Sequence, residues 1–72
     1  MSRHGDLLIE KLIERLDYDD PITRRNAAGA LRLHGDRAAP AIPALRRLLN
    51  DEHKMVRMEA ERALERLTTR VA

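Results

Sequence analysis

The sequence predicts an all-α protein in which a hairpin of two helices occurs twice. Apolar residues recur every three or four positions through most of the chain, which is the spacing of one helix face. The hydrophobic residues, 43% of the total, are almost all Ala, Leu, Ile, Val and Met. The second half repeats the pattern of the first at an offset of 33 residues. A chain of 72 residues holds one domain, 1–72, whose core gives only a few kcal/mol of net stability.

The first predicted helix runs from Leu7 to about Leu16, with Asp6 as its N-cap. Its apolar residues form one stripe, roughly 140° wide at 100° per residue. The stripe consists of Leu8, Ile9, Leu12, Ile13 and Leu16. Because one neighbouring helix would not cover so wide a stripe, we expect part of it to contact another molecule.

The second predicted helix runs from Pro21 to about Leu33. Asp20 is a favourable N-cap, and proline fits the first helical position because its missing N–H has no partner there. Its inner face is expected to hold Thr23, Ala27, Ala30 and Leu31. Gly35 is expected to end this helix, since glycine adopts the positive φ of a helix C-terminus.

The third and fourth predicted helices form the second hairpin. Pro40 and Pro43 are placed in the first turn of the third helix, where proline is tolerated. The fourth helix is predicted from about Lys54 to Thr68. The predicted inner residues are Ile42, Leu45, Leu48 and Leu49 on the third helix, and Val56, Ala60, Ala63, Leu64 and Leu67 on the fourth.

The two hairpins correspond residue by residue at the inward positions. Ile9, Leu12 and Leu16 match Ile42, Leu45 and Leu49, while Arg24, Ala27 and Ala30–Leu31 match Arg57, Ala60 and Ala63–Leu64. A two-helix unit that recurs at this interval is typical of an α-solenoid. The predicted repeats are 7–34 and 40–69.

The stretch from Gly35 to Leu67 resembles a HEAT repeat of the short bacterial type, close to the HEAT-like repeats of phycobilisome-lyase proteins. The resemblance is carried by the run Ala41-Ile42-Pro43-Ala44-Leu45, the Leu48-Leu49 pair, Asp51, Val56-Arg57, Ala60 and Ala63-Leu64. The first half matches less fully, because Thr23 stands where the family prefers Val. In the second half, His53-Lys54 replaces the Asp-Pro cap. The resemblance implies an armadillo/HEAT-like solenoid and a scaffold that binds protein, but names no partner.

Arg24 and Arg57 occupy equivalent positions at the start of the second helix of each hairpin. The resemblance implies that each is a ladder arginine that bonds acidic turn residues of its own or an adjacent repeat. The expected partners are Asp19, Asp51 and Glu52. We favour this structural role over ligand binding.

The sequence offers no constellation of residues for catalysis, so we expect a protein that is not an enzyme and holds no metal or cofactor. Without cysteine there is no disulfide, thiol nucleophile or zinc–thiolate site. The three histidines (His4, His34 and His53) lack the i, i+4 spacing of a helical metal site. The N-terminus lacks the apolar core of a signal peptide, and the longest apolar run, "AAPAIPAL", is too short to span a bilayer. We therefore expect a cytoplasmic protein with no membrane contact.

Two repeats are fewer than the three or so that a solenoid needs to be stable alone. The chain is therefore expected either to associate, with another protein or with itself as a homo-oligomer, or to be an excised or engineered piece of a longer array. The residues predicted to make this contact are Leu8, Ile9, Leu12 and Ile13, with Met55 and Met58 as the second choice. Pairing through one shared patch would give a closed dimer, and end-to-end stacking a ring or filament.

Two other functions stay open. Arg62, Arg66 and Arg70 form a basic stripe on the fourth helix that could follow nucleic-acid phosphates. Against this, Glu59 and Glu65 lie within pairing distance along the helix, and no aromatic residues accompany the stripe to stack on bases. The other function, an accessory subunit of a tetrapyrrole-attaching lyase, rests on the family resemblance alone.

Overall fold

The structure, a computed structural model, describes residues 4–69, and this part of the chain is helical, with short turns and no strand. In chain order the elements are α1 (His4–Arg15), α2 (Pro21–His34), the 3₁₀ segment η1 (Gly35–Ala41), α3 (Ile42–Arg47), the 3₁₀ turn η2 (Leu48–Asn50) and α4 (Lys54–Thr68). The prediction of an all-α fold is therefore confirmed. No helix within residues 4–69 has the length and apolar character needed to cross a membrane.

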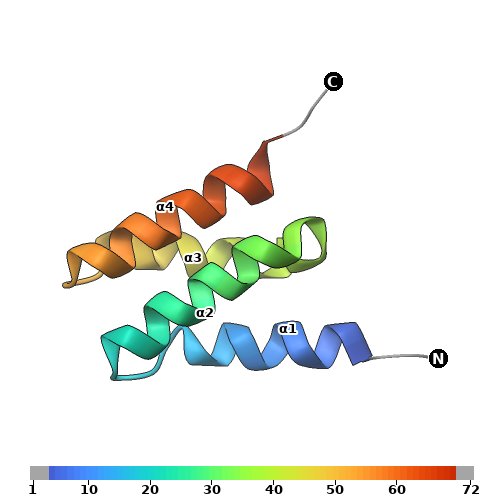
Figure 1. Cartoon of the computed structure of the whole chain (residues 1–72), viewed down its shortest axis with the longest axis horizontal. Helices are drawn as coiled ribbons and strands as arrows, with labels where there is room; N and C mark the ends of the chain where they lie inside the picture. The colour runs from blue at the N-terminus through green and yellow to red at the C-terminus, as the bar shows by residue number, and fades with distance from the viewer. Residues whose placement is uncertain (1–3, 70–72) are drawn as a thin grey trace.

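The helices are arranged as two antiparallel hairpins whose second helices lie side by side. In Figure 1, α1 runs in one direction along the lower edge and α2 returns above it. The segment from η1 to η2 then runs back behind α2 and α4, and α4 follows the direction of α2. The contact between α2 and α4 is the most extensive between any two elements of the described chain. The helices α2 and α4 therefore form the join between the two halves of the molecule.

The third predicted helix is not one regular α-helix, so the count of four regular helices is not confirmed. Pro43 does lie in the first turn of α3, as predicted, but Pro40 lies in the preceding 3₁₀ segment η1. Proline lacks an N–H and its ring clashes with the carbonyl four residues earlier, so the α-helix cannot extend back through Pro43 to include Pro40. Only six residues of α3 remain between the two 3₁₀ segments.

The predicted ends of α2 and α4 are confirmed, whereas the predicted start of the first helix is not. The side chain of Asp20 accepts a hydrogen bond from the N–H of Ile22 at 3.3 Å, so it caps α2 as expected. Gly35 has a φ of +63° directly after α2, and α4 spans the predicted residues. The prediction that Asp6 caps the first helix is wrong, because α1 begins at His4 and Asp6 lies within it.

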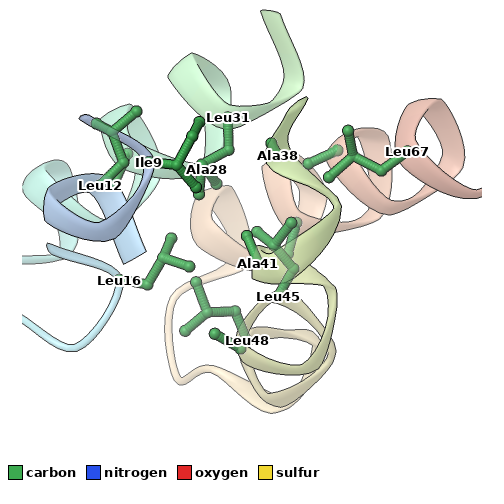
Figure 2. Packing of buried hydrophobic residues seen from close by; sticks show 14 of the residues in the cluster. Ile9, Leu12, Leu16, Ala28, Leu31, Ala38, Ala41, Leu45, Leu48 and Leu67 are labelled. Carbon is green, nitrogen blue, oxygen red and sulfur yellow. The ribbon is translucent and has the colours of Figure 1, made fainter. Parts of the chain in front are cut away.

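The core is built largely from alanine and leucine (Figure 2). Side chains from every helical element converge on it. The stripe predicted for α4 is buried at Val56, Ala60, Ala63 and Leu67 and half-buried at Leu64. Three alanines that the helix patterns did not identify, Ala28, Ala38 and Ala41, are fully buried. Small side chains at these places allow the backbones to approach closely, which is how a core without large aromatic residues becomes close-packed.

Candidate interaction surface on α2 and α4

Arg24 joins the turn of the first hairpin to the turn of the second. Its Nη1 donates to the backbone carbonyls of Tyr18 at 2.6 Å and Asp19 at 2.8 Å. Its Nε and Nη2 donate to the two carboxylate oxygens of Asp51 at 2.8 and 3.1 Å. This two-point geometry is the strongest arrangement that an arginine and a carboxylate can form. Of the predicted acidic partners, Asp51 contributes its carboxylate, whereas Asp19 contributes only its carbonyl.

The environment of Asp51 favours its ionised form. Burial by itself would raise the pKa of this carboxyl, but hydrogen bonds from Arg24 and from the backbone N–H of His53 outweigh it, so the pKa lies below its ordinary value. The same bond raises the pKa of Arg24. The Asp51 side chain is 8% exposed and that of Arg24 is 13% exposed, so the pair is largely shielded from solvent.

Arg57 makes the same bonds to its own turn as Arg24 but lacks the ion pair. Its Nη1 donates to the carbonyls of Asp51 at 2.8 Å and Glu52 at 3.2 Å, which are the equivalents of Tyr18 and Asp19 in the first turn. Within residues 4–69, Arg57 makes no ion pair with a carboxylate. The predicted ladder role is therefore found in full at Arg24, while at Arg57 only the bonds to its own turn are present.

A second cross-repeat ion pair lies farther along α2 and α4. The Nε of Arg32 is 3.1 Å from the carboxylate of Glu59, and Arg62 approaches the other oxygen of that carboxylate at 3.8 Å. Glu59 extends over Gly29, since a Cβ at that glycine would lie 3.3 Å from its Oε2. A side chain larger than hydrogen at this point would therefore push the carboxylate away from its place between the two arginines.

The outward side of these two helices combines apolar and basic side chains. We call it the α2–α4 face, and it consists of Ile22, Arg25, Gly29, Arg32, Leu33, Met55, Met58, Glu59, Arg62, Glu65 and Arg66. Leu33 is 76% exposed, the highest value of any large hydrophobic residue in the described chain. Two shallow hollows that share Arg32 lie along this face, one bordered by Gly29 and Leu33 and the other by Arg62 and Arg66.

The structure corrects most of the association surface predicted on the first helix. Ile9 and Leu12 are 4% and 7% exposed and belong to the core of the same chain, and Ile13 is half-buried against it. The helix α1 contacts both α2 and η1, so two neighbours rather than one cover its wide apolar stripe. Leu8 alone of the four predicted residues is exposed, together with Leu7 beside it.

The other predicted contact residues lie mainly on the α2–α4 face. Met55 and Met58 are exposed there, and so are Arg62 and Arg66. The prediction for Arg70 falls outside the described residues. Arg25, Arg32 and Leu33 were not predicted as contact residues, and Glu59 was expected only to pair with arginines of its own helix. One signal could have identified the ion pair of Arg32 and Glu59. These residues are separated by 27 positions, the same separation as between Arg24 and Asp51.

Comparison with known proteins agrees with this arrangement of hairpins. A family model described as HEAT repeats matches residues 9–72. No curated protein and no solved structure was found to match the chain. The matched region contains most of α1, all of the later elements and both equivalent arginines. The chain therefore belongs to the family of HEAT-repeat proteins.

Proposed function

We propose that this chain is a non-enzymatic scaffold that binds another protein on its α2–α4 face. HEAT repeats generally mediate contacts between proteins, and this chain is one of them. The observation that carries the proposal is the presence of four exposed apolar side chains, Ile22, Leu33, Met55 and Met58, on the joined second helices. Exposed apolar side chains that gather on one face, with polar residues around them, are typical of a contact site.

The rigidity of this face supports the same function. The two helices are tied together by the Arg24–Asp51 and Arg32–Glu59 pairs and by the buried alanines between them. A surface that is already ordered loses little conformational entropy when a partner binds, which increases affinity.

A photo-crosslinking amino acid placed at Leu33 tests the proposal. In cells that produce the chain, we expect a crosslinked product of discrete mass from this position. The matched control places the same amino acid at Arg47, which is exposed on α3, away from the α2–α4 face. Equal yields of product from both positions, or none from Leu33, would contradict the assignment of the face.

Self-association through a different surface is compatible with this scaffold function, and in it a second copy is the partner. The exposed Leu7 and Leu8 on α1 support contact between like patches in a closed dimer. Head-to-tail stacking in the register of the internal α2–α4 contact is less favourable. It would place Glu61 and Arg62 where that contact has the small residues Ala28 and Gly29.

Nucleic-acid binding is the second candidate function, and the arginines of α4 support it. Arg62 and Arg66 border one hollow together with Arg32, so three guanidinium groups surround one depression. Affinity for nucleic acid would fall steeply with salt and with replacement of these arginines. The next subsection gives the reasons for preferring a protein partner.

A further inference from the structure

The α2–α4 face carries more positive charge than its own carboxylates neutralise. Arg25, Arg32, Arg62 and Arg66 supply four positive charges, and Glu59 and Glu65 supply two negative charges. The carboxylate of Glu59 already pairs with two of these arginines, since its oxygens lie 3.1 Å from the Nε of Arg32 and 3.8 Å from the Nη1 of Arg62. Arg25 donates to the side-chain oxygen of Asn26 and to the sulfur of Met55, which are both neutral. Among the side chains of residues 7–69, Arg25 and Arg66 make no ion pair.

These charges border the hollows rather than being scattered over the molecule. Arg25 and Arg32 border the hollow that contains Gly29 and Leu33. Arg32 borders the second hollow as well, together with Arg62 and Arg66. We call these two hollows, which share Arg32, the track; arginines border both of them, and the exposed Leu33 lies beside the first.

The composition of the track favours an acidic protein segment over a nucleic acid. A strand of nucleic acid is usually held by aromatic side chains that stack on its bases, and no residue of the α2–α4 face is aromatic. Glu59 and Glu65 would repel a continuous row of phosphates. Leu33, Met55 and Met58 need apolar side chains opposite them, which a peptide can supply between its carboxylates.

We propose that the α2–α4 face binds an acidic segment of a partner protein in which carboxylates alternate with apolar side chains. Carboxylates of the partner pair with Arg25, Arg62 and Arg66, and an apolar side chain packs on Leu33. This inference rests on the proposed function and names the chemistry of the partner that the face accepts.

Fluorescence anisotropy with synthetic peptides tests the proposal. The probe is a fluorescein-labelled peptide that repeats Glu-Glu-Leu-Leu, and its neutral counterpart repeats Gln-Gln-Leu-Leu. A single-stranded oligothymidine is the nucleic-acid probe. The protein variants are the pair Arg62→Glu and Arg66→Glu together, and as a matched control the pair Arg46→Glu and Arg47→Glu on α3. Both double variants change the net charge equally, and all four arginines are exposed, so both are expected to fold.

The proposal predicts that the glutamate peptide binds at least about tenfold more tightly than the glutamine peptide. The α4 double variant should lose most of this difference, whereas the α3 double variant should lose only the small part due to net charge. Leu33→Ser should weaken the binding of both peptides. Equal affinity for the two peptides, absence of binding, or an equal loss in both double variants would overturn the proposal.

The outcomes separate this inference from the function on which it rests. If the glutamine peptide binds as well as the glutamate peptide and Leu33→Ser weakens both, the face binds protein but does not select acidic partners. If oligothymidine binds more tightly than either peptide and its binding depends on Arg62 and Arg66, the face binds nucleic acid and the inference is wrong. If crosslinking at Leu33 captures no protein, the proposed function itself fails.

Discussion

Arg24 and Arg57 offer a comparison within one molecule, because equivalent side chains have different sets of partners. Arg24 bonds two carbonyls of its own turn and a shielded carboxylate in the next one. Arg57 bonds only the two carbonyls. The difference between them isolates the contribution of the ion pair that joins the repeats.

We predict that Arg24→Gln lowers the free energy of unfolding by about 2–3 kcal/mol, because it leaves the shielded Asp51 without its charged donor. Arg57→Gln is the matched control and should cost only about 1 kcal/mol, since it removes hydrogen bonds to neutral carbonyls. Urea unfolding followed by circular dichroism measures both. Equal losses would show that the pair with Asp51 adds nothing to stability.

The stability contributed by Asp51 should depend on pH. Its pKa is lower in the folded chain than in the unfolded chain, so between those two values the unfolded state binds more protons. The contribution is therefore fully present above the unfolded pKa of about 3.9 and is lost as pH falls through the folded pKa. The gap in unfolding free energy between the native chain and Asp51→Asn should shrink as pH is lowered from neutral into this acidic range. A gap that stays constant would mean that the carboxylate charge has no net effect.

The family resemblance gave Asp51 as one of three expected partners of the ladder arginines, whereas nothing predicted the pair of Arg32 and Glu59. Arg24 and Arg57 were detectable because the repeat preserves them, whereas the equivalents of Arg32 and Glu59 are Glu65 and Asn26. The Arg32–Glu59 pair is therefore not repeated 33 residues on, and only its separation of 27 residues, shared with Arg24 and Asp51, points to it. The burial of Ile9 and Leu12 escaped prediction for a different reason: periodicity identifies the apolar face of a helix but not how many neighbours cover it.

At the scale of elements, long helices were predictable and the composite third segment was not. The ends of α2 and α4 follow from local chemistry: the Asp20 cap, Pro21 and Gly35 for α2, and the start of a strong apolar period for α4. The third segment is a six-residue α-helix between two 3₁₀ segments: Pro43 stops the α-helix from extending back to Pro40, and the segment before it buries Ala38 and Ala41. That packing is tertiary, and the spacing of the leucines does not report it.

The α2–α4 contact should be sensitive to the size of residue 29. We predict that Gly29→Leu lowers the free energy of unfolding by about 1–3 kcal/mol, because the added side chain meets the carboxylate that Arg32 holds in place. The loss should occur although leucine is intrinsically the better helix former by roughly 1 kcal/mol. Thermal unfolding measures the effect.

The double variant Gly29→Leu with Glu59→Ala is the matched control for this prediction. It removes the obstructing carboxylate, so we expect it to recover part of the stability lost by Gly29→Leu alone. A single variant as stable as the native chain would show that Glu59 moves aside without cost.

At the scale of the whole molecule, the open question is whether one copy is stable by itself. The described residues of both hairpins already share one cluster of buried side chains, so a single copy buries apolar surface between its own repeats. The family and the all-α class were predictable from the sequence because both depend on the repeat. The contact surface was predicted only in part, because exposure depends on how the two hairpins pack.

We predict that mass measured by light scattering is 8.3 kDa at low concentration and rises toward twice that value at high concentration. Leu8→Glu should keep the mass at the monomer value with unchanged helical content, since this side chain is exposed on α1. Leu12→Glu is a contrasting variant that should unfold the chain instead, because it places a charge in the core. A mass that is independent of concentration would contradict self-association through α1.

The separation of 27 residues between Arg24 and Asp51 has a consequence for how such a molecule can be lengthened. Copying one hairpin, 7–34, would not reproduce the internal contact, because the carboxylate that Arg24 uses lies in the next turn. A second copy of residues 25–57 inserted after Arg57 would instead give Arg57 its own carboxylate, the copied Asp51, at the same separation. The insert would also bring Ala28 and Gly29 to the new contact, and Asn26→Glu in the copy would restore the partner of Arg32. The segment that can be duplicated with its contacts intact therefore begins inside α2 and ends inside α4, and its bounds differ from those of the two hairpins.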